Sequence, residues 1–373
     1  LLVPLEPLES KIDWPEIPPS TPFKMCQTSG STGKPKTFVF SHSQIVTLGR
    51  QYEMYWSSQD RLFFEHQMSH NWGSELIIAS MFCGVTIVLF KALPVRAAIE
   101  LMRRKKITLA GMAAYRIREL LEHGSDELNQ LPDMQFLDVS SSVLHPEERK
   151  LFQQRFTPNI YDCYGTTEVS DISISGPDDL DSHPGSAGRP YPGVEVEIVN
   201  DSHQPVPTGT IGLLRVRSDN ILTEYYKNAE ASLKCFRDGW FYPLDHAYVD
   251  NDGYIYLRGR SDDAINAGGI NFYPIEIERA LMTHPRIREA VVFGWPDKKW
   301  GEIVIAVIST LSPVEAEKVR AYCQKYLAPH MVPDYVLPVK LIPKTTAGKI
   351  KLTSIKEMVK VRLDKLAESR DTA

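Results

Sequence analysis

Apolar runs and mixed stretches alternate along the chain up to residue 176. The runs at 61–66, 85–90, 107–112, 134–139 and 159–163 predict strands, as does a short run at 37–40. The stretches 75–83, 94–105, 115–123 and 146–156 predict helices, and Ser41 is placed to cap a further helix that extends to about residue 56. Strands that alternate with helices favour an α/β fold, in which helices cover a mainly parallel sheet.

Beyond residue 176 the pattern changes to period-two alternation, which is typical of half-buried strands. Residues 194–199, 212–217 and 254–257 are separated by Pro-Thr-Gly and Asn-Asp-Gly turns and predict a small β-subdomain. A polar stretch at 258–263 has no apolar period and predicts a boundary between a large domain, residues 1–261, and a smaller one, residues 262–373. The smaller domain is expected to be α+β, with helices at 274–282 and 314–327 and strands at 290–293, 303–309 and 336–342.

Composition narrows the class of protein. With 373 residues, 43% of them hydrophobic and 24% charged, the chain is long enough for two domains and ordinary for a globular protein. A net charge of −5 without a basic run argues against nucleic-acid binding, and no apolar run approaches the ~18 residues of a membrane span. The five cysteines are scattered and form no Cys-x-x-Cys pair, so we expect reduced thiols in a cytoplasmic protein, with neither a disulfide framework nor a zinc site.

A loop rich in small polar residues lies at 28–36. It holds hydroxyl side chains, glycines and lysines: Thr28, Ser29, Gly30, Ser31, Thr32, Gly33, Lys34 and Lys36. Glycines let successive backbone N–H groups point at one anion, and hydroxyl and ammonium groups add donors and charge, as a polyphosphate requires. Pro35 follows Lys34, so the spacing is not that of a P-loop and excludes an ordinary P-loop NTPase. Taken alone, the loop is equally compatible with a solvated turn.

A second polar motif, Tyr161-Asp-Cys-Tyr-Gly-Thr-Thr-Glu168, follows the start of the predicted strand at 159–163. Ligands of open α/β sheets bind at the carboxyl ends of the strands, so Thr166, Thr167 and Glu168 are well placed for a metal–phosphate group. The alternative is a helix start, with Thr166 or Thr167 as the N-cap and Glu168 in the first turn.

Further motifs follow in order: Gly185-Ser-Ala-Gly-Arg-Pro190, Asp245 before a hairpin, Gly259-Arg-Ser-Asp-Asp263, Gly268-Gly-Ile-Asn-Phe-Tyr-Pro-Ile-Glu-Ile-Glu278, and Pro343-Lys-Thr-Thr-Ala-Gly-Lys349. Together with the two motifs above, the set resembles the adenylate-forming superfamily: acyl- and aryl-CoA synthetases, peptide-synthetase adenylation domains and firefly luciferase. The resemblance spans nearly all of residues 28–349 and implies an acid–thiol type of ligase. In the reaction that it implies, ATP and a small carboxylic acid give an acyl-adenylate and pyrophosphate. A thiol, from CoA or the phosphopantetheine of an acyl carrier protein, or an amine then takes the acyl group.

The resemblance also implies roles for single residues in the nucleotide site. The loop residues Thr28 to Gly33, with Lys36, would wrap the β- and γ-phosphates of ATP. Thr167 would touch the α-phosphate or the carboxylate, and Glu168 would hold Mg²⁺. Tyr164 would lie against the adenine, with Gly165 and Thr166 next to Tyr164. Asp245 and Arg260 would bind the ribose.

The C-terminal motifs receive two further roles from the resemblance. Lys349 would be catalytic, bridging the carboxylate and the α-phosphate, and a point charge on a flexible stem suits a group that enters and leaves a site. Asp262 would be the hinge about which a mobile C-terminal domain swings between adenylation and transfer.

The stretch at 68–73, Met-Ser-His-Asn-Trp-Gly, stands where relatives select their acid. Amino-acid-activating relatives carry an Asp there to pair with the substrate ammonium, and this chain has none. The run resembles aryl-acid activators: His70 would line the carboxylate entry, Asn71 would read a ring substituent and Trp72 would pack on the ring. Ser141 stands where relatives place a Gly-Gly pair and would lie beside the substrate. The alternatives are a general acyl acid, with Asn71 as a helix cap and Trp72 in the core.

One departure from the superfamily lies at the front of the chain. Relatives carry a further βαβ layer before the phosphate loop, whereas 27 residues precede Thr28 here. This predicts either a short form or a chain without its front part. It also predicts an apolar flank around residues 76–90 and 107–112 that another copy of the chain or a partner protein would cover, with a two-fold homodimer as the simplest solution. It also leaves open a degenerate relative that holds a nucleotide or acyl-adenylate without turnover. Retention of Glu168, Asp245 and Lys349 together favours the enzyme.

Overall fold

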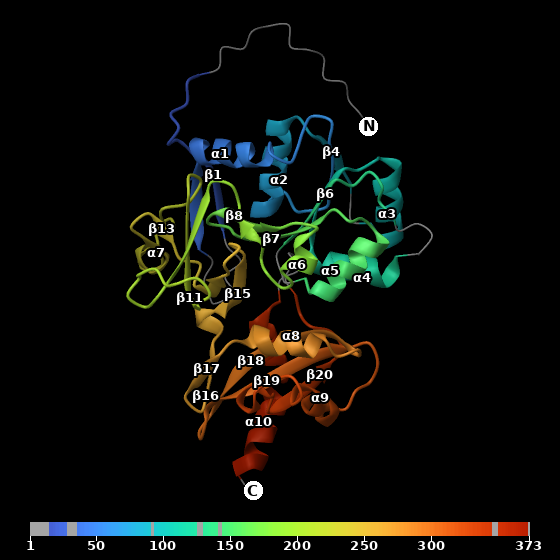
Figure 1. Ribbon diagram of the computed structural model, residues 1–373, viewed down its shortest axis with the longest axis vertical. Helices are drawn as coiled ribbons and strands as arrows, with labels where there is room; N and C mark the ends of the chain where they lie inside the picture. The colour runs from blue at the N-terminus through green and yellow to red at the C-terminus, as the bar shows by residue number, and fades with distance from the viewer. Residues whose placement is uncertain are drawn as a thin grey trace.

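The described part of the chain forms four β-sheets with helices packed on them (Figure 1). The computed structural model describes residues 15–27, 36–90, 93–124, 130–140, 144–344 and 350–371. The elements that follow residue 263 form a separate group at the lower end of the molecule, coloured orange and red. Among the helices of these ranges, none combines the length and apolar character that a membrane crossing requires.

The central element is a seven-stranded sheet in the order β4-β3-β5-β6-β7-β8-β9. Its strands are β3 (Arg61–Phe64), β4 (Thr86–Leu89), β5 (Leu109–Ala113), β6 (Phe136–Ser140), β7 (Ile160–Thr166), β8 (Ser170–Ser175) and β9 (Arg189–Pro190). The pairings from β4 to β7 are parallel, and β8 pairs antiparallel with both β7 and β9. The prediction of an α/β fold with a mainly parallel sheet is confirmed.

Helices cover both faces of this sheet because successive side chains of a strand point to opposite sides. Leu62 and Phe64 share a core with α1 (His42–Tyr52) and α2 (Asn71–Cys83), and the intervening Phe63 shares another with α3 (Val95–Arg104), α4 (Ala114–His123) and α5 (Pro146–Arg155). The short helix α6 (Asp179–Ser182) follows β8. Ser41 caps α1 through a capping box with Gln44, as the sequence predicts.

The motif at 161–168 forms a hairpin and does not start a helix. β7 extends to Thr166, residues 167–169 turn, and Ser170 opens β8 opposite Thr166. The alternative in which Thr166 or Thr167 caps a helix is therefore wrong. Gly165 permits the close approach of the two strands, since a Cβ there would lie 2.3 Å from the carbonyl oxygen of Ser170.

Two antiparallel sheets complete the part of the chain before residue 261. One pairs β1 (Pro22–Gln27) with β2 (Thr37–Ser41). The other is six-stranded: β10 (Val194–Val199), β11 (Gly212–Ser218), β12 (Phe236–Arg237), β13 (Trp240–Phe241), β14 (Asp245–Val249) and β15 (Ile255–Arg260), with α7 (Ala229–Cys235) before β12. This second sheet is the β-subdomain that period-two alternation predicts.

The C-terminal group is a five-stranded sheet with helices on both sides, as the α+β prediction requires. The 3₁₀ helix η1 (Ser261–Asp263) leads into this group. Its elements are β16 (Ile265–Ala267), β17 (Ile270–Phe272), α8 (Pro274–Met282), β18 (Ile287–Asp297), β19 (Gly301–Thr310), α9 (Ala316–Cys323), η2 (Pro329–Met331), β20 (Tyr335–Val339) and α10 (Leu352–Asp371). Helix α10 was not expected from the sequence, and its residues Ile355, Val359 and Leu363 pack into the core on one face of the sheet.

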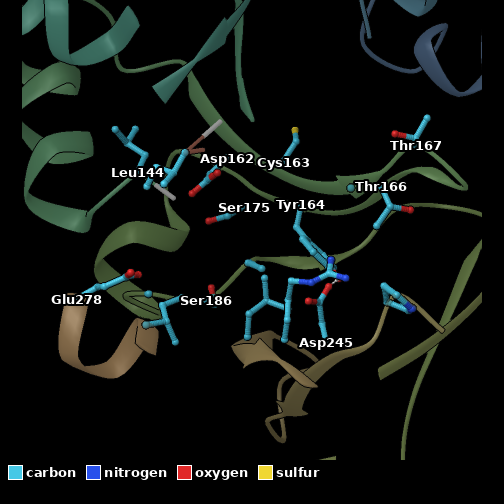
Figure 2. Close-up of a pocket in the computed structure, with 18 of the residues that line it drawn as sticks. Leu144, Asp162, Cys163, Tyr164, Thr166, Thr167, Ser175, Ser186, Asp245 and Glu278 are labelled. Atoms are coloured by element: carbon cyan, nitrogen blue, oxygen red, sulfur yellow. Dashed lines mark hydrogen bonds between the residues drawn. The ribbon is translucent and has the colours of Figure 1, made fainter. Parts of the chain in front are cut away.

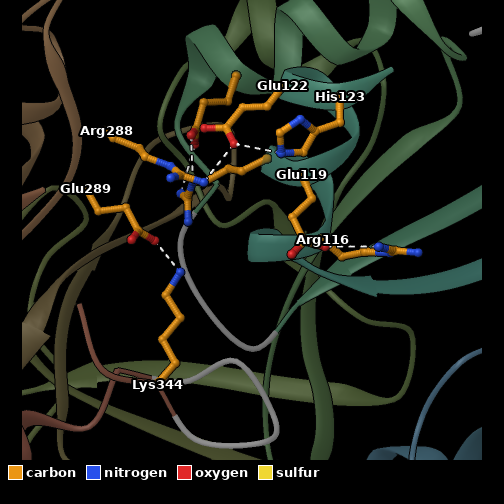
Figure 3. A network of polar contacts seen from close by, with 9 residues as sticks. Arg116, Glu119, Glu122, His123, Arg288, Glu289 and Lys344 are labelled. Atoms are coloured by element: carbon orange, nitrogen blue, oxygen red, sulfur yellow. Dashed lines mark hydrogen bonds and ion pairs between the residues drawn. The ribbon is translucent and has the colours of Figure 1, made fainter. Parts of the chain in front are cut away.

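Ion pairs join the C-terminal group to the rest of the chain. Arg288 of β18 donates to Glu122 at the end of α4, with 2.7 Å between Nη2 and Oε2 (Figure 3). On the other side, Arg258 of β15 donates to Glu276 of α8 at 2.6 Å. These contacts connect β18 to α4 and α8 to β15.

Candidate active site

A cleft of about 660 Å³ lies where the β7–β8 hairpin, the start of β14 and helix α8 meet (Figure 2). Ten of the predicted site residues line it: Lys36, His70, Asn71, Tyr164, Gly165, Thr166, Thr167, Glu168, Asp245 and Arg260. Residues of the C-terminal group, among them Glu278 and Lys344, form another part of its wall. The fold thus collects into one cleft residues that are far apart in the sequence.

Several predicted site residues lie outside the described ranges: Thr28, Ser29, Gly30, Ser31, Thr32, Gly33, Ser141 and Lys349. Gln27 and Lys36, which flank the first of these segments, line the cleft. So do Lys344 and Ile350, which flank the last. The roles implied for the undescribed residues stay predictions.

Tyr164 and Asp245 meet at the centre of the cleft (Figure 2). The Tyr164 hydroxyl donates to Asp245 Oδ2 at 2.5 Å, and burial raises the pKa of both groups. Asp245 opens β14 directly opposite Arg260, the last residue of β15. This pairing places a carboxylate and a guanidinium at one edge of the β-subdomain, where both line the cleft.

Glu168 at the tip of the β7–β8 hairpin is buried and held by Tyr225, whose hydroxyl donates to Glu168 Oε1 at 2.6 Å. The Lys36 ammonium lies 4.6 Å from the centre of the Tyr225 ring. Nearby in the hairpin, the buried Thr166 hydroxyl has no hydrogen-bond partner among the described residues. Carboxylate and hydroxyl oxygens are ligands that Mg²⁺ accepts, so this corner fits a hard cation bound to phosphate.

The stretch predicted to select the acid begins helix α2. His70 is the N-cap residue without a side-chain capping bond, so the alternative that Asn71 caps the helix is wrong. Asn71 is 8% exposed, and its side chain donates from Nδ2 to Glu75 Oε1 at 2.6 Å. Trp72 lies away from the described wall of the cleft, with its indole 4.2 Å from the His66 ring. Its contact with the substrate ring stays a prediction.

Two further polar residues of the wall were not singled out from the sequence. Arg149 of α5 is buried and donates from Nη1 to Ser175 Oγ at 2.8 Å. Asp162 in β7 has its pKa raised by burial to about 6. Arg149 and Ser175 lie 26 residues apart, and no local signal marks Arg149. Asp162 stands inside the motif at 161–168, where the resemblance gives it no role. Asp262, the predicted hinge, lies in η1 and accepts from Lys234 at 3.1 Å.

Comparison with known proteins places the chain in a family. Residues 5–226 match the AMP-binding enzyme family and residues 276–349 match the AMP-binding enzyme C-terminal domain. The chain belongs to the AMP-binding enzyme family, which confirms the resemblance to adenylate-forming enzymes.

Two relatives and one solved structure illustrate the similarity. The chain is 32% identical to the uncharacterized acyl–CoA ligase YhfT of Bacillus subtilis (strain 168), over 92% of this chain and 70% of the relative. It is 29% identical to the indoleacetate–CoA ligase of Aromatoleum aromaticum, over 92% and 69%. The O-succinylbenzoate coenzyme A synthetase MenE of Bacillus subtilis, solved in complex with ATP and a magnesium ion, superposes with a TM-score of 0.81 at 26% identity, over 89% of this chain and 69% of that one.

Proposed function

We propose that the chain is an ATP-dependent carboxylic-acid ligase. It joins the acid to AMP with release of pyrophosphate and then passes the acyl group to a thiol or an amine. The observation that carries this proposal is the convergence of Tyr164, Glu168 and Asp245 on one cleft, in a chain of the AMP-binding enzyme family. The similarity to two CoA ligases and to a synthetase solved with ATP and magnesium supports it.

The chemistry requires two anions to meet. A carboxylate oxygen attacks the α-phosphate while pyrophosphate leaves, so negative charge must be neutralised where it develops. We assign the phosphates to the loop of Thr28 to Gly33 and to Lys36, and the ribose to Asp245 and Arg260. Mg²⁺ on Glu168 would neutralise phosphate charge, and Thr167 and Lys349 would bind where the carboxylate meets the α-phosphate.

We assign the acid to the part of the cleft at the start of α2, where His70 and Asn71 line the wall. An aromatic acid is the proposed substrate, in keeping with the indoleacetate and succinylbenzoate named for two of the compared enzymes. Both of those names also specify CoA, which favours a thiol over an amine as the acceptor.

The proposed ligase works as two domains, residues 1–261 and 262–373, that meet at Asp262. The ion pair of Asp262 with Lys234 of α7 is exposed, and such pairs contribute about 0–1 kcal/mol. Loss of this contact therefore costs little free energy when the chain rearranges at η1. The C-terminal domain would bring Lys349 to the cleft for adenylation and withdraw it for transfer.

We also propose that two copies of the chain associate. Met81 and Leu89, on α2 and on the edge strand β4, are 76% and 58% exposed, and Phe82 beside them is 42% exposed. A sheet edge flanked by large apolar side chains is a surface that a second chain can cover. Light scattering at micromolar concentration should give the mass of a dimer, and Leu89→Lys should give a monomer. A monomeric wild-type protein would contradict this proposal.

The test of the proposed ligase is acid-dependent pyrophosphate release. The protein is incubated with ATP, Mg²⁺ and a panel of aryl and alkyl acids, first without and then with CoA. We expect release with at least one aromatic acid and none without acid. ATP binding without release for every acid would instead identify a relative that holds nucleotide without turnover.

A further inference from the structure

A histidine and two carboxylates meet at the rim of the cleft, and the proposed ligase assigns none of them a role. His183 is the C-cap residue of α6 and lines the cleft, whereas Asp250 and Asp252 belong to the turn between β14 and β15. His183 Nε2 lies 3.3 Å from Asp252 Oδ2 and 3.9 Å from Asp250 Oδ2. Each residue offers one ligand atom, and the three atoms lie within 4.8 Å of one another. For such separations, a point about 2.0–2.4 Å from all three atoms exists, which is the distance at which nitrogen and oxygen bind a divalent cation.

The contacts around His183 aim its Nε2 atom at the carboxylates. The Ser182 hydroxyl donates to the carbonyl oxygen of Asp178 at 3.2 Å, so the Ser182 oxygen is the acceptor for His183 Nδ1, which lies 3.0 Å away. Nδ1 therefore carries a hydrogen, and Nε2 is the nitrogen that faces the two carboxylates. The ring also stacks on Tyr254, with 3.6 Å between the ring centres and 11° between the planes. A hydrogen bond from the other ring nitrogen is what orients most metal-binding imidazoles.

The two carboxylates each turn one oxygen toward His183. Asp250 Oδ1 accepts from the backbone N–H groups of Asp252 and Tyr254 at 3.0 and 2.9 Å, which leaves Oδ2 on the side of the imidazole. Asp252 Oδ2 is the outer ligand atom, on a side chain that is 68% exposed. An ion held by these three atoms would keep further coordination positions for water, as zinc sites with three protein ligands do.

Two species can stand between Nε2 and the carboxylates: a proton, which makes an imidazolium ion pair, or a metal ion. An imidazolium offsets the charge of one carboxylate, whereas a divalent ion offsets both, so the convergence of two carboxylates on one nitrogen favours the metal. An imidazole nitrogen combined with carboxylate oxygens suits Zn²⁺, whereas Mg²⁺ prefers oxygen ligands alone. The donor set therefore selects a cation different from the one that the corner around Glu168 fits.

We propose that His183, Asp250 and Asp252 form a second metal site, which binds a divalent transition-metal ion of the zinc class at the rim of the cleft. The site is separate from the proposed Mg²⁺ on Glu168, and the proposal does not depend on ligase activity. The cysteine spacing predicts no zinc site, but this donor set needs no cysteine. The ion would fasten the β14–β15 turn to the segment 183–187, whose last two residues line the cleft. It thereby stabilises one wall of the cleft from outside the proposed nucleotide contacts.

Metal titration of the nucleotide-free protein tests the proposal. After dialysis against a chelator, ZnCl₂, MnCl₂, CaCl₂ and MgCl₂ are titrated separately by calorimetry near neutral pH, and the melting temperature is measured with each salt. We expect one equivalent of Zn²⁺ to bind with a Kd of about 10 μM or lower, at least about 100-fold more tightly than Mg²⁺. Zn²⁺ at about 100 times its Kd should raise the melting temperature by about 2–4 °C. ATP is absent, so the phosphate oxygens that would complete the proposed Mg²⁺ site are absent too.

Three variants locate the ion. His183→Gln removes the nitrogen ligand and should weaken Zn²⁺ binding at least about tenfold. Asp252→Asn should weaken it by a similar factor, and its largely exposed side chain makes a folding defect no explanation of the loss. His123→Gln is the matched control: His123 is 66% exposed and pairs with Glu122 at 3.6 Å, and its loss should not change the affinity for Zn²⁺. No Zn²⁺ binding by the wild type, or equal affinity in wild type and His183→Gln, overturns the proposal and leaves His183 in an ion pair.

Discussion

Arg288 of β18 donates to Glu122 at the end of α4 at 2.7 Å, and so joins residues on either side of the proposed domain boundary. The next residue, Glu289, pairs with Lys344, which precedes the segment of Lys349 (Figure 3). The start of β18 therefore contacts both α4 and the chain that leads to the proposed catalytic lysine.

Arg288→Ala should slow acid-dependent pyrophosphate release by up to about fivefold, because an exposed ion pair contributes up to about 1 kcal/mol to the orientation that it holds. The melting temperature should stay within about 3 °C of the wild type. Arg286→Ala is the matched control, since Arg286 bonds the carbonyl oxygen of Pro313 within the same group of elements. Equal rates for the two variants would remove the assigned role from Arg288.

Tyr225 offers a test of the proposed metal site. Its hydroxyl bonds Glu168 at 2.6 Å, and loss of such a partner lowers metal affinity by about 10–100-fold. Tyr225→Phe should therefore raise the Mg²⁺ concentration that gives half-maximal pyrophosphate release by about tenfold. The neighbouring Tyr226 is 44% exposed, and Tyr226→Phe should leave the Mg²⁺ dependence as it is. An unchanged Mg²⁺ dependence in Tyr225→Phe would argue against Glu168 as the ligand.

Burial of Glu75 should make the stability of the protein depend on pH. Its pKa is raised from 4.5 to about 7 by burial in the folded state, so the folded chain holds the proton more tightly than the unfolded chain. The contribution is complete below about pH 4.5 and is lost as the pH rises through about 7. Between pH 5 and 8 the free energy of unfolding should fall by roughly 1–3 kcal/mol more in the wild type than in Glu75→Gln.

Denaturant unfolding at several pH values measures this difference. Glu100→Gln is the control, because the Glu100 side chain is 54% exposed and pairs with Arg96 on the surface of α3. Parallel pH profiles for wild type and Glu75→Gln would show that Glu75 is ionised in the folded protein throughout this range.

Lys349 is the residue on which the adenylation chemistry depends most. An interaction made mainly in the transition state affects the rate and not the affinity, so Lys349→Ala should lower pyrophosphate release at least about 100-fold while ATP binds within about threefold of wild type. Lys351→Ala, two residues further at an exposed position, should behave as wild type. Adenylation by Lys349→Ala within a few-fold of wild type would refute the assignment.

Local patterns predicted much of the fold. The strand at 194–199 and the helix at 274–282 have their predicted bounds, because alternation and a Pro at the first helical turn are local signals. In the β7–β8 hairpin, by contrast, no local pattern predicts the second strand. Its strand at 170–175 carries Ser170, Ser173 and Ser175 buried by tertiary packing, and no local pattern distinguishes these serines from loop residues.

The residues of the candidate site also fall into two groups: those that a local motif predicts and those that only the structure identifies. Glu168 and Asp245 stand in motifs that the sequence of a single chain shows, and these motifs predict both as site residues. Glu75 and Tyr225 stand in no such motif. Their hydrogen-bond partners, Ser170 and Glu168, lie 95 and 57 residues away in the sequence. Such contacts follow from the packing of distant elements, which the sequence of one chain does not encode locally.

The central claim is that an oxygen of the acid attacks the α-phosphate of ATP, and isotope transfer tests it most directly. The acid with the fastest pyrophosphate release is labelled with ¹⁸O in its carboxylate, and the nucleotide formed with CoA or another acceptor is analysed by mass spectrometry. The attacking oxygen becomes the bridge of the acyl-adenylate and stays with the phosphate when the acyl group leaves. We therefore predict AMP that carries one ¹⁸O per turnover, whereas unlabelled AMP, or ADP in its place, would contradict the account.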